Sequence, residues 1–103
     1  MFTHLHLHTE YSLLDATIRV SDLIEKLQNS GMKSCAVTDH GSMYGIFKFQ
    51  QQMKDAGLKP IIGCEIYIAP RSMHEKEFGI DNEYYHMVLL AKNLKGYKNL
   101  MKI

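Results

Sequence analysis

Three histidines alternate along one short stretch near the N-terminus: His4, His6 and His8 are separated by single residues. In an extended chain alternate residues face the same side, so a strand over residues 2–8 would carry three imidazoles on one face. A purification tag would be an unbroken histidine run, and a solvent-facing stripe would more often use Lys, Glu or Thr. Because neutral imidazole is the commonest side-chain metal ligand, the spacing predicts a metal site on an inward-facing strand.

Further ligand-type residues fall at or near the ends of later apolar runs: Asp39, His40, Glu65 and His86. Glu65 lies inside the run 61–68, where a carboxylate is costly to bury unless it is paired or bound to metal. The alternative for Glu65 is an edge-strand position facing water, and for His86 a hydrogen-bonded core histidine. Asp15 lies in the loop after the first stretch, where it could fold back over the same site. The ends of parallel strands meet at one mouth, so we expect these side chains to gather there.

The residue types define the chemistry of this expected site. Imidazole and carboxylate ligands without thiolate suit Zn²⁺, Mn²⁺ or Fe and argue against a purely structural zinc site. Carboxylates that bridge metals about 3.5–4 Å apart are typical of phosphoester hydrolysis, in which the metal lowers the pKa of a bound water. The sequence has no Gly-rich phosphate loop and suggests no Ser/His/Asp triad. A metal-dependent phosphoesterase site is therefore expected.

The elements that must position these residues read as alternating strands and helices. Strands are expected over 2–8, 34–38, 61–69 and 84–91, and helices over 22–30, 43–56 and from 94 to the chain end. Ser21, Ser42 and Asn93 are the expected N-caps. Nearly continuous apolar strands that alternate with helices predict an α/β fold with a mainly parallel sheet or barrel.

Length and charge limit the other possibilities. A chain of 103 residues with a net charge of +1 is expected to form one domain, and its charge gives no overall reason to bind nucleic acid or a membrane. No apolar stretch reaches the roughly 18 residues of a membrane span. Cys35 and Cys64 lie in apolar runs and are expected to be buried, reduced thiols of a cytoplasmic protein.

Four motifs in order resemble the early motifs of the PHP (polymerase and histidinol phosphatase) superfamily: His6-Leu7-His8-Thr9, Thr38-Asp39-His40-Gly41, Gly63-Cys64-Glu65 and Tyr85-His86-Met87-Val88. Residues 9–15, 41–45, 59–65 and 89–93 are more similar to the branch formed by the N-terminal PHP domains of bacterial DNA polymerase III alpha subunits than to free-standing histidinol phosphatases. The resemblance covers essentially the whole chain.

This resemblance implies a distorted (β/α)7 barrel with up to three divalent metals at one mouth, Zn or Mn, with Fe or Mg as further options. The implied ligands, which would act in catalysis through the bound metal, are His6, His8, Asp15, His40, Glu65 and His86. Asp39 would contact the ligands rather than a metal. His4 stands where many relatives carry Asp, and it would contact the ligands or serve the fold. The family supplies later ligands that this chain lacks, so residues 1–103 are expected to be a partial PHP domain.

Three functions stay open on this basis. The chain is an N-terminal segment of a bacterial replicative polymerase subunit with a site for 3′-5′ exonuclease or pyrophosphate hydrolysis, a stand-alone phosphatase, or a non-catalytic scaffold. The first and third imply as partners the rest of the polymerase subunit, the DNA 3′ end, and replisome subunits such as a proofreading exonuclease. The expected location is the bacterial cytoplasm, with no membrane partner. The isolated chain is expected to self-associate or to be only marginally stable, and to have little or no phosphoesterase activity of its own.

Overall fold

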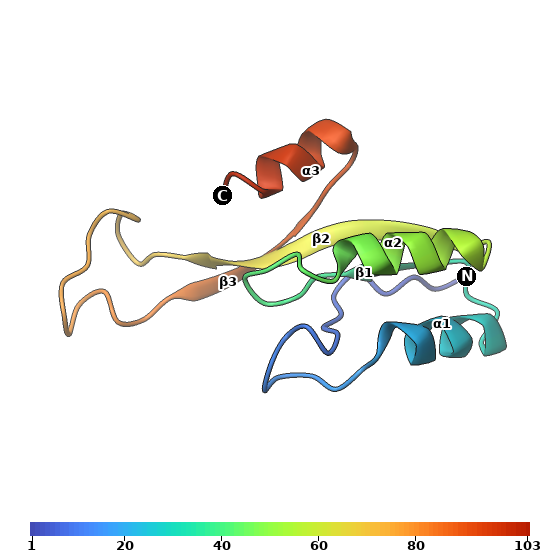
Figure 1. Ribbon diagram of the computed structural model, residues 1–103. Coiled ribbons are helices and arrows are strands. Elements are labelled where there is room, and N and C mark those ends of the chain that lie inside the picture. Colours follow the sequence, from blue (N-terminus) through green and yellow to red (C-terminus); the bar gives the residue numbers. More distant parts are fainter.

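A three-stranded sheet with the order β1-β2-β3 forms the centre of the structure (Figure 1). The computed structural model describes residues 1–103. Its elements are α1 (Val20–Asn29), β1 (Ser34–Val37), α2 (Ile46–Asp55), β2 (Lys59–Ile68), β3 (Tyr85–Leu90) and α3 (Leu94–Leu100). Strand β1 pairs with β2 in parallel, and helix α2 forms the crossover that connects them. The expected α/β class is confirmed. None of the helices is long and apolar enough to cross a membrane.

Strand β3 runs antiparallel to β2, with Glu65 opposite Val88 and Tyr67 opposite His86. The expected parallel direction is therefore wrong for this last strand. A parallel return needs a crossover of a dozen or more residues, usually a helix, whereas an antiparallel return needs only a loop. Residues 69–84 contain no helix, and they project from the end of the sheet as a long loop (Figure 1).

The N-terminal segment lies beside β1 but is not the regular strand expected over 2–8. Its only ladder contact is an isolated bridge between His4 and Cys35. The His4 carbonyl accepts from Ala36 N–H at 2.8 Å, and the Leu7 carbonyl accepts from Thr38 N–H at 2.8 Å. From His4 to Leu7 the segment thus advances three residues, while β1 advances two, from Ala36 to Thr38. The extra residue breaks the alternation of side chains along the segment. His4 consequently does not share a face with both other histidines.

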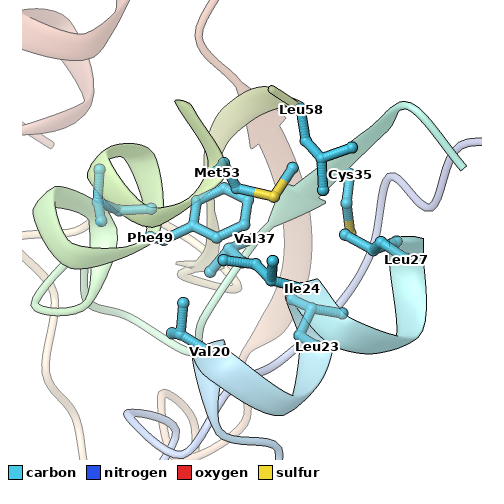
Figure 2. Packing of buried hydrophobic residues seen from close by; sticks show 10 residues of the cluster. Val20, Leu23, Ile24, Leu27, Cys35, Val37, Phe49, Met53 and Leu58 are labelled. Carbon is cyan, nitrogen blue, oxygen red and sulfur yellow. The ribbon is translucent and has the colours of Figure 1, made fainter. Parts of the chain in front are cut away.

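The hydrophobic core lies between helices α1 and α2 and the β1 side of the sheet (Figure 2). Helix α1 contributes side chains at helical spacing: Val20, Leu23, Ile24 and Leu27. Helix α2 contributes Ile46, Phe49 and Met53, all of which are buried. These apolar faces are as the sequence predicts. Neither β3 nor α3 contains a fully buried residue, so the core does not extend to the part of the sheet formed by β3.

Two of the expected helix starts differ from the structure. Arg19 occupies the N-cap of α1 and Gly45 that of α2, and neither helix has a side-chain cap. The chain turns through residues 42–45 before α2 begins, and Gly45 packs so closely under Tyr11 that a Cβ would lie 2.5 Å from the ring. The third cap is confirmed, since the Asn93 side chain accepts a hydrogen bond from Gly96 N–H at the start of α3.

Candidate metal centre

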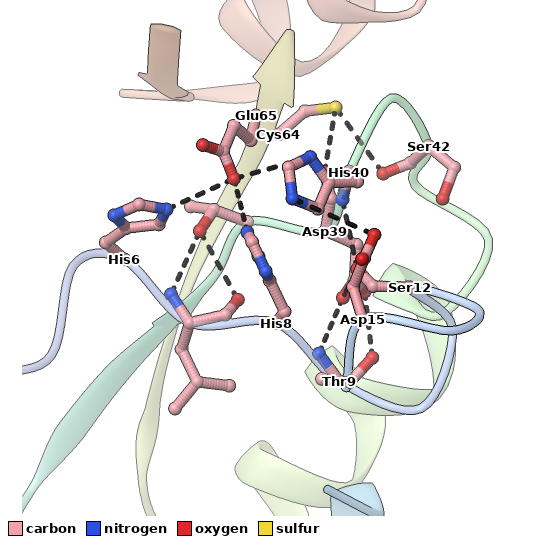
Figure 3. Close-up of polar contacts among 12 residues, drawn as sticks. His6, His8, Thr9, Ser12, Asp15, Asp39, His40, Ser42, Cys64 and Glu65 are labelled. Carbon is pink, nitrogen blue, oxygen red and sulfur yellow. Dashed lines mark hydrogen bonds and ion pairs between the residues drawn. The ribbon is translucent and has the colours of Figure 1, made fainter. Parts of the chain in front are cut away.

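The carboxylate of Glu65 is the meeting point of three imidazole rings (Figure 3). Its Oε2 atom lies 3.1 Å from His6 Nε2 and 3.6 Å from His40 Nδ1, and it also contacts His8 Nε2. Glu65 is only 7% exposed although it lies within the strand β2. One ligand atom each from His6, His8 and Glu65 can be chosen so that all lie within 4.8 Å of one another. This is a compact donor set for a cation.

The hydrogen-bonding inventory of these residues fits a cation better than it fits a closed network. A neutral imidazole has one N–H and one lone pair, so a single carboxylate leaves lone pairs on the surrounding rings without a partner. His40 Nδ1 is buried and has no hydrogen-bond partner, although it faces Glu65. Nitrogen and carboxylate oxygen donors together suit Zn²⁺, Mn²⁺ or Fe. The residues present therefore fit a bound divalent metal.

The electrostatics favour an ionised Glu65. Burial raises the pKa of this carboxyl, but hydrogen bonds from His6 and His8 and electrostatic attraction to His40 and His8 outweigh burial. The net pKa of Glu65 lies below its ordinary value. The group is thus held as a carboxylate, the form that binds metal.

Asp15 approaches the same cluster from the loop that precedes α1. Its Oδ2 lies 4.0 Å from His40 Nε2, and its side chain is 58% exposed. His40 therefore presents one ring nitrogen toward Glu65 and the other toward Asp15 (Figure 3). Leu14, the residue before Asp15, has a φ of 70°, a left-handed conformation that lets the chain turn at this point.

His86 reaches the cluster from β3. Its ring lies edge-on to His40, with the centroids 5.0 Å apart. It sits opposite Tyr67, and Tyr67 shares the sheet face of Glu65 because the two are two residues apart on β2. The structure therefore brings His86 beside the donor set, although it contacts neither Glu65 nor Asp15 through a hydrogen bond.

His4 is the predicted residue that the structure leaves outside this cluster. Its ring packs edge-on against Phe2 at 4.7 Å, and its carbonyl is bonded to β1. Of the two roles expected for His4, contact with the ligands is absent, and the geometry supports the one in which His4 serves the fold.

Asp39 holds the two ligand-bearing loops together from behind. It is 1% exposed and accepts hydrogen bonds from the Thr9 backbone at 2.6 Å, the Thr9 hydroxyl at 2.8 Å and the Ser12 hydroxyl at 2.8 Å. The Ser12 oxygen in turn accepts from the backbone N–H of His40 at 3.0 Å. Asp39 thus positions His40 and the segment after His8 without facing the donor set. The sequence reasoning assigned no role to Thr9, since nothing local marks it as the partner of a distant aspartate.

The two cysteines take no part in the donor set. Both are free and buried, as predicted. The Cys64 thiol donates to the carbonyls of Asp39 and Ser42 at 3.5 Å each, so it braces the turn beside His40.

The family model that matches the chain is the PHP domain, over residues 4–103. Among curated proteins, the chain is 48% identical over 103 residues to the DNA polymerase III subunit alpha of Borreliella burgdorferi, covering 99% of the chain and 9% of that protein. It is 50% identical over 101 residues to the corresponding subunit of Helicobacter pylori strain J99, covering 97% of the chain and 8% of that protein. The chain thus spans less than a tenth of the length of these relatives.

Solved structures agree on the fold. An amidohydrolase from Chromobacterium violaceum, solved with bound sulfate and no metal, matches 98% of the chain and 32% of its own with a TM-score of 0.65 and 19% identity. A protein described as a metal-dependent phosphoesterase from Bifidobacterium adolescentis matches 97% of the chain and 32% of its own, with the same TM-score of 0.65 and identity of 19%. The resemblance expected from the motifs is confirmed, and the chain belongs to the PHP domain family.

Proposed function

We propose that this chain is the PHP segment of a DNA polymerase III alpha subunit and that its metal centre hydrolyses phosphoesters. The observation that carries the proposal is the convergence of His6, His8 and His40 on the buried carboxylate of Glu65. The identity of 48–50% to polymerase subunits supports the first part. A role at DNA would place the protein in the bacterial cytoplasm.

His6, His8 and Glu65 would hold a first divalent cation, with Zn or Mn as the expected metal. His40, Asp15 and His86 surround this set and would supply donors for further ions, up to three. When bound, such cations supply polarisation of a phosphoryl oxygen and a lowered pKa for a coordinated water. The chain itself keeps Glu65 ionised and fixes His40 through the Ser12 and Asp39 contacts.

The proposed substrate is the last phosphodiester at a DNA 3′ end, hydrolysed as a 3′-5′ exonuclease. Pyrophosphate, a phosphoanhydride, is the alternative substrate for the same donors. The candidate ligands support access from solvent, because His86 lies exposed on β3 and the side chains of His6 and Asp15 are each 58% exposed. Two alternative functions would remain if the donors did not hydrolyse DNA. The chain would then be a scaffold that binds a proofreading exonuclease, or a stand-alone phosphatase.

The test uses the full-length subunit that contains this chain. A Glu65→Gln variant should lose most metal-dependent removal of 3′ nucleotides and keep nucleotide addition, because polymerisation would use residues outside this segment. Glu25→Gln, an exposed position on α1, is the matched control. If Glu65→Gln lost nucleotide removal and nucleotide addition equally, the metal centre would have a structural role and not a catalytic one. Absence of 3′ hydrolysis from the unaltered subunit with Zn, Mn, Fe or Mg would reject the proposed reaction.

A further inference from the structure

A cleft of about 580 Å³ lies beside the candidate metal centre, between the end of β2 and the long β2–β3 loop. Tyr67 and Tyr84 form two of its walls, with Met73 from the loop. The two tyrosine rings meet at an angle of 81° with centroids 4.9 Å apart, so they make a corner of two aromatic surfaces. Both residues remain half exposed, Tyr67 at 50% and Tyr84 at 57%. Large aromatic surfaces left open in a cleft are available to a planar ligand.

Tyr67 connects this cleft to the metal centre. Its ring is nearly parallel to that of His40, at an interplanar angle of 10° and a centroid separation of 6.2 Å. It also lies 5.2 Å from the ring of His86, and Tyr84 lies 5.5 Å from the same ring. A ligand in the tyrosine corner would therefore lie next to two candidate metal ligands. The cleft and the centre are thus neighbours that share Tyr67 as a common wall.

We propose that this cleft binds the nucleobase of the nucleotide whose phosphodiester is presented to the metal centre. This inference rests on the proposed function and specifies its substrate as a single-stranded nucleic acid end. Aromatic side chains stack on any base, because every base has a π-face. The volume lies within the range of about 300–1,000 Å³ that is usual for small-molecule sites.

The polar lining separates the base from its phosphate. The cleft is bordered by the carboxylates of Glu75, Asp81 and Glu83 and by one cation, Lys76. Carboxylates accept hydrogen bonds from the exocyclic amines of bases, and their excess over the single lysine disfavours phosphate. Arg71 pairs with Asp81 at 2.6 Å and with Glu75 at 3.6 Å, so Glu83 is the lining carboxylate that lies outside any ion pair. The charged phosphodiester would consequently stay outside the cleft, on the side of the cation-binding donors.

The loop that forms the outer wall is fixed in place. Arg71 donates to both carboxylate oxygens of Asp81, at 2.9 Å from Nε and 2.6 Å from Nη2. The Glu77 backbone N–H also donates to Asp81 at 2.6 Å. These contacts close the loop on itself, so the cleft is formed before a ligand arrives.

The experiment measures base binding separately from hydrolysis. A single-stranded oligonucleotide with 2-aminopurine at its 3′ end is added to the full-length subunit in EDTA, and fluorescence quenching reports stacking. We expect Tyr84→Ala to weaken binding by about tenfold, the effect of losing one stacked aromatic. Tyr84→Phe, which retains the aromatic ring, should bind the oligonucleotide as tightly as the unaltered protein. Tyr85→Ala is the control, because Tyr85 is equally exposed but absent from the cleft lining.

A second arm compares removal of a normal 3′ nucleotide with removal of an abasic one, with metal present. The unaltered protein should prefer the normal end, Tyr84→Ala should remove that preference, and the control Tyr85→Ala should keep it. Hydrolysis with no preference and no Tyr84 dependence would overturn the base cleft and leave the phosphoesterase proposal intact. Tyr84-dependent quenching without any hydrolysis would reject the phosphoesterase activity and retain the cleft as a base-binding site.

Discussion

The backbone N–H of Thr9 donates a 2.6 Å hydrogen bond to Asp39 Oδ1, across 30 positions of sequence. This contact joins the segment that carries His6 and His8 to the turn that carries His40. Asp39 itself is buried behind the donor set and does not face it. The relative position of the candidate ligands therefore depends on a carboxylate that would touch no metal.

Replacing Asp39 by Asn should destabilise the chain by about 2–4 kcal/mol, because one carboxylate oxygen becomes an amide donor facing other donors. Three hydrogen bonds from Thr9 and Ser12 depend on those oxygens. Urea unfolding followed by circular dichroism would measure the loss. Asp55→Asn at the exposed end of α2 is the control. Identical midpoints for the two variants would show that the buried network adds nothing to stability.

Metal binding should depend on Glu65. Glu65→Gln removes the charge around which His6, His8 and His40 are arranged, and we expect the affinity for Zn²⁺ or Mn²⁺ to fall by about 100-fold or more. Titration calorimetry gives the affinity, and elemental analysis gives the stoichiometry. His6→Ala combined with His8→Ala should lower the bound metal in the same assay. Unchanged stoichiometry in that double variant would remove both histidines from the ligand set.

Gly63 allows β2 to lie closely between its neighbours. A Cβ at this position would lie 2.6 Å from the Leu89 carbonyl oxygen and 2.9 Å from Thr38 Cγ2. Gly63→Ala should therefore force β2 and β3 apart and lower stability by about 2–3 kcal/mol. Gly96→Ala in α3 is the matched control, because its nearest neighbour would be 3.4 Å away. Thermal unfolding of the two variants separates steric crowding from the general effect of replacing glycine.

Cys35 should resist alkylation at mildly alkaline pH. Burial raises the pKa of its thiol from 9.0 to about 11, so the reactive thiolate is scarce in the folded chain. Because the folded pKa is the higher one, the stability that this group contributes is complete below pH 9 and is lost as the pH rises toward 11. Iodoacetamide labelling of a Cys64→Ala chain at pH 8.5, with and without urea, measures the reactivity of Cys35 in the folded and unfolded chain. Equally fast labelling in both conditions would contradict a buried, protonated thiol.

The sequence predicts the elements that depend on local pattern better than those that depend on distant contacts. The apolar spacing in α1 and α2 identifies their buried faces correctly, because a helix face is set by residues three and four apart. The break in the segment over 2–8 follows instead from its register with β1, and the close approach of Gly45 to Tyr11 beside the start of α2 is likewise a contact between distant parts of the chain. The direction of β3 was readable, since residues 70–83 show no helical pattern that could form a crossover.

The site shows the same division. His6, His8, His40 and Glu65 gather as expected, with Asp15 and His86 beside them, because each lies near a strand end or an adjoining loop. Their role as ligands stays a prediction. The support given by Thr9 and Ser12 to Asp39 could not be predicted, because no spacing rule links residues 27–30 positions apart. A regular strand over 2–8 would have placed His4 on the face of His6 and His8, and it does not do so because the alternation is broken after His4.

The isolated chain should self-associate. Strand β3 is at the edge of the sheet, and its outer backbone groups have no partner strand. The side chains of Tyr85, Met87 and Leu90 on this strand are exposed, so the edge combines open hydrogen-bonding groups with apolar surface. Light scattering should show dimers or larger species, and Met87→Lys should reduce them because a charged edge strand opposes pairing. Leu14→Lys, at an exposed position on a loop away from this edge, should leave association unchanged. A monodisperse monomer with a sharp cooperative melt would mean that the exposed edge of β3 does not pair with a second chain.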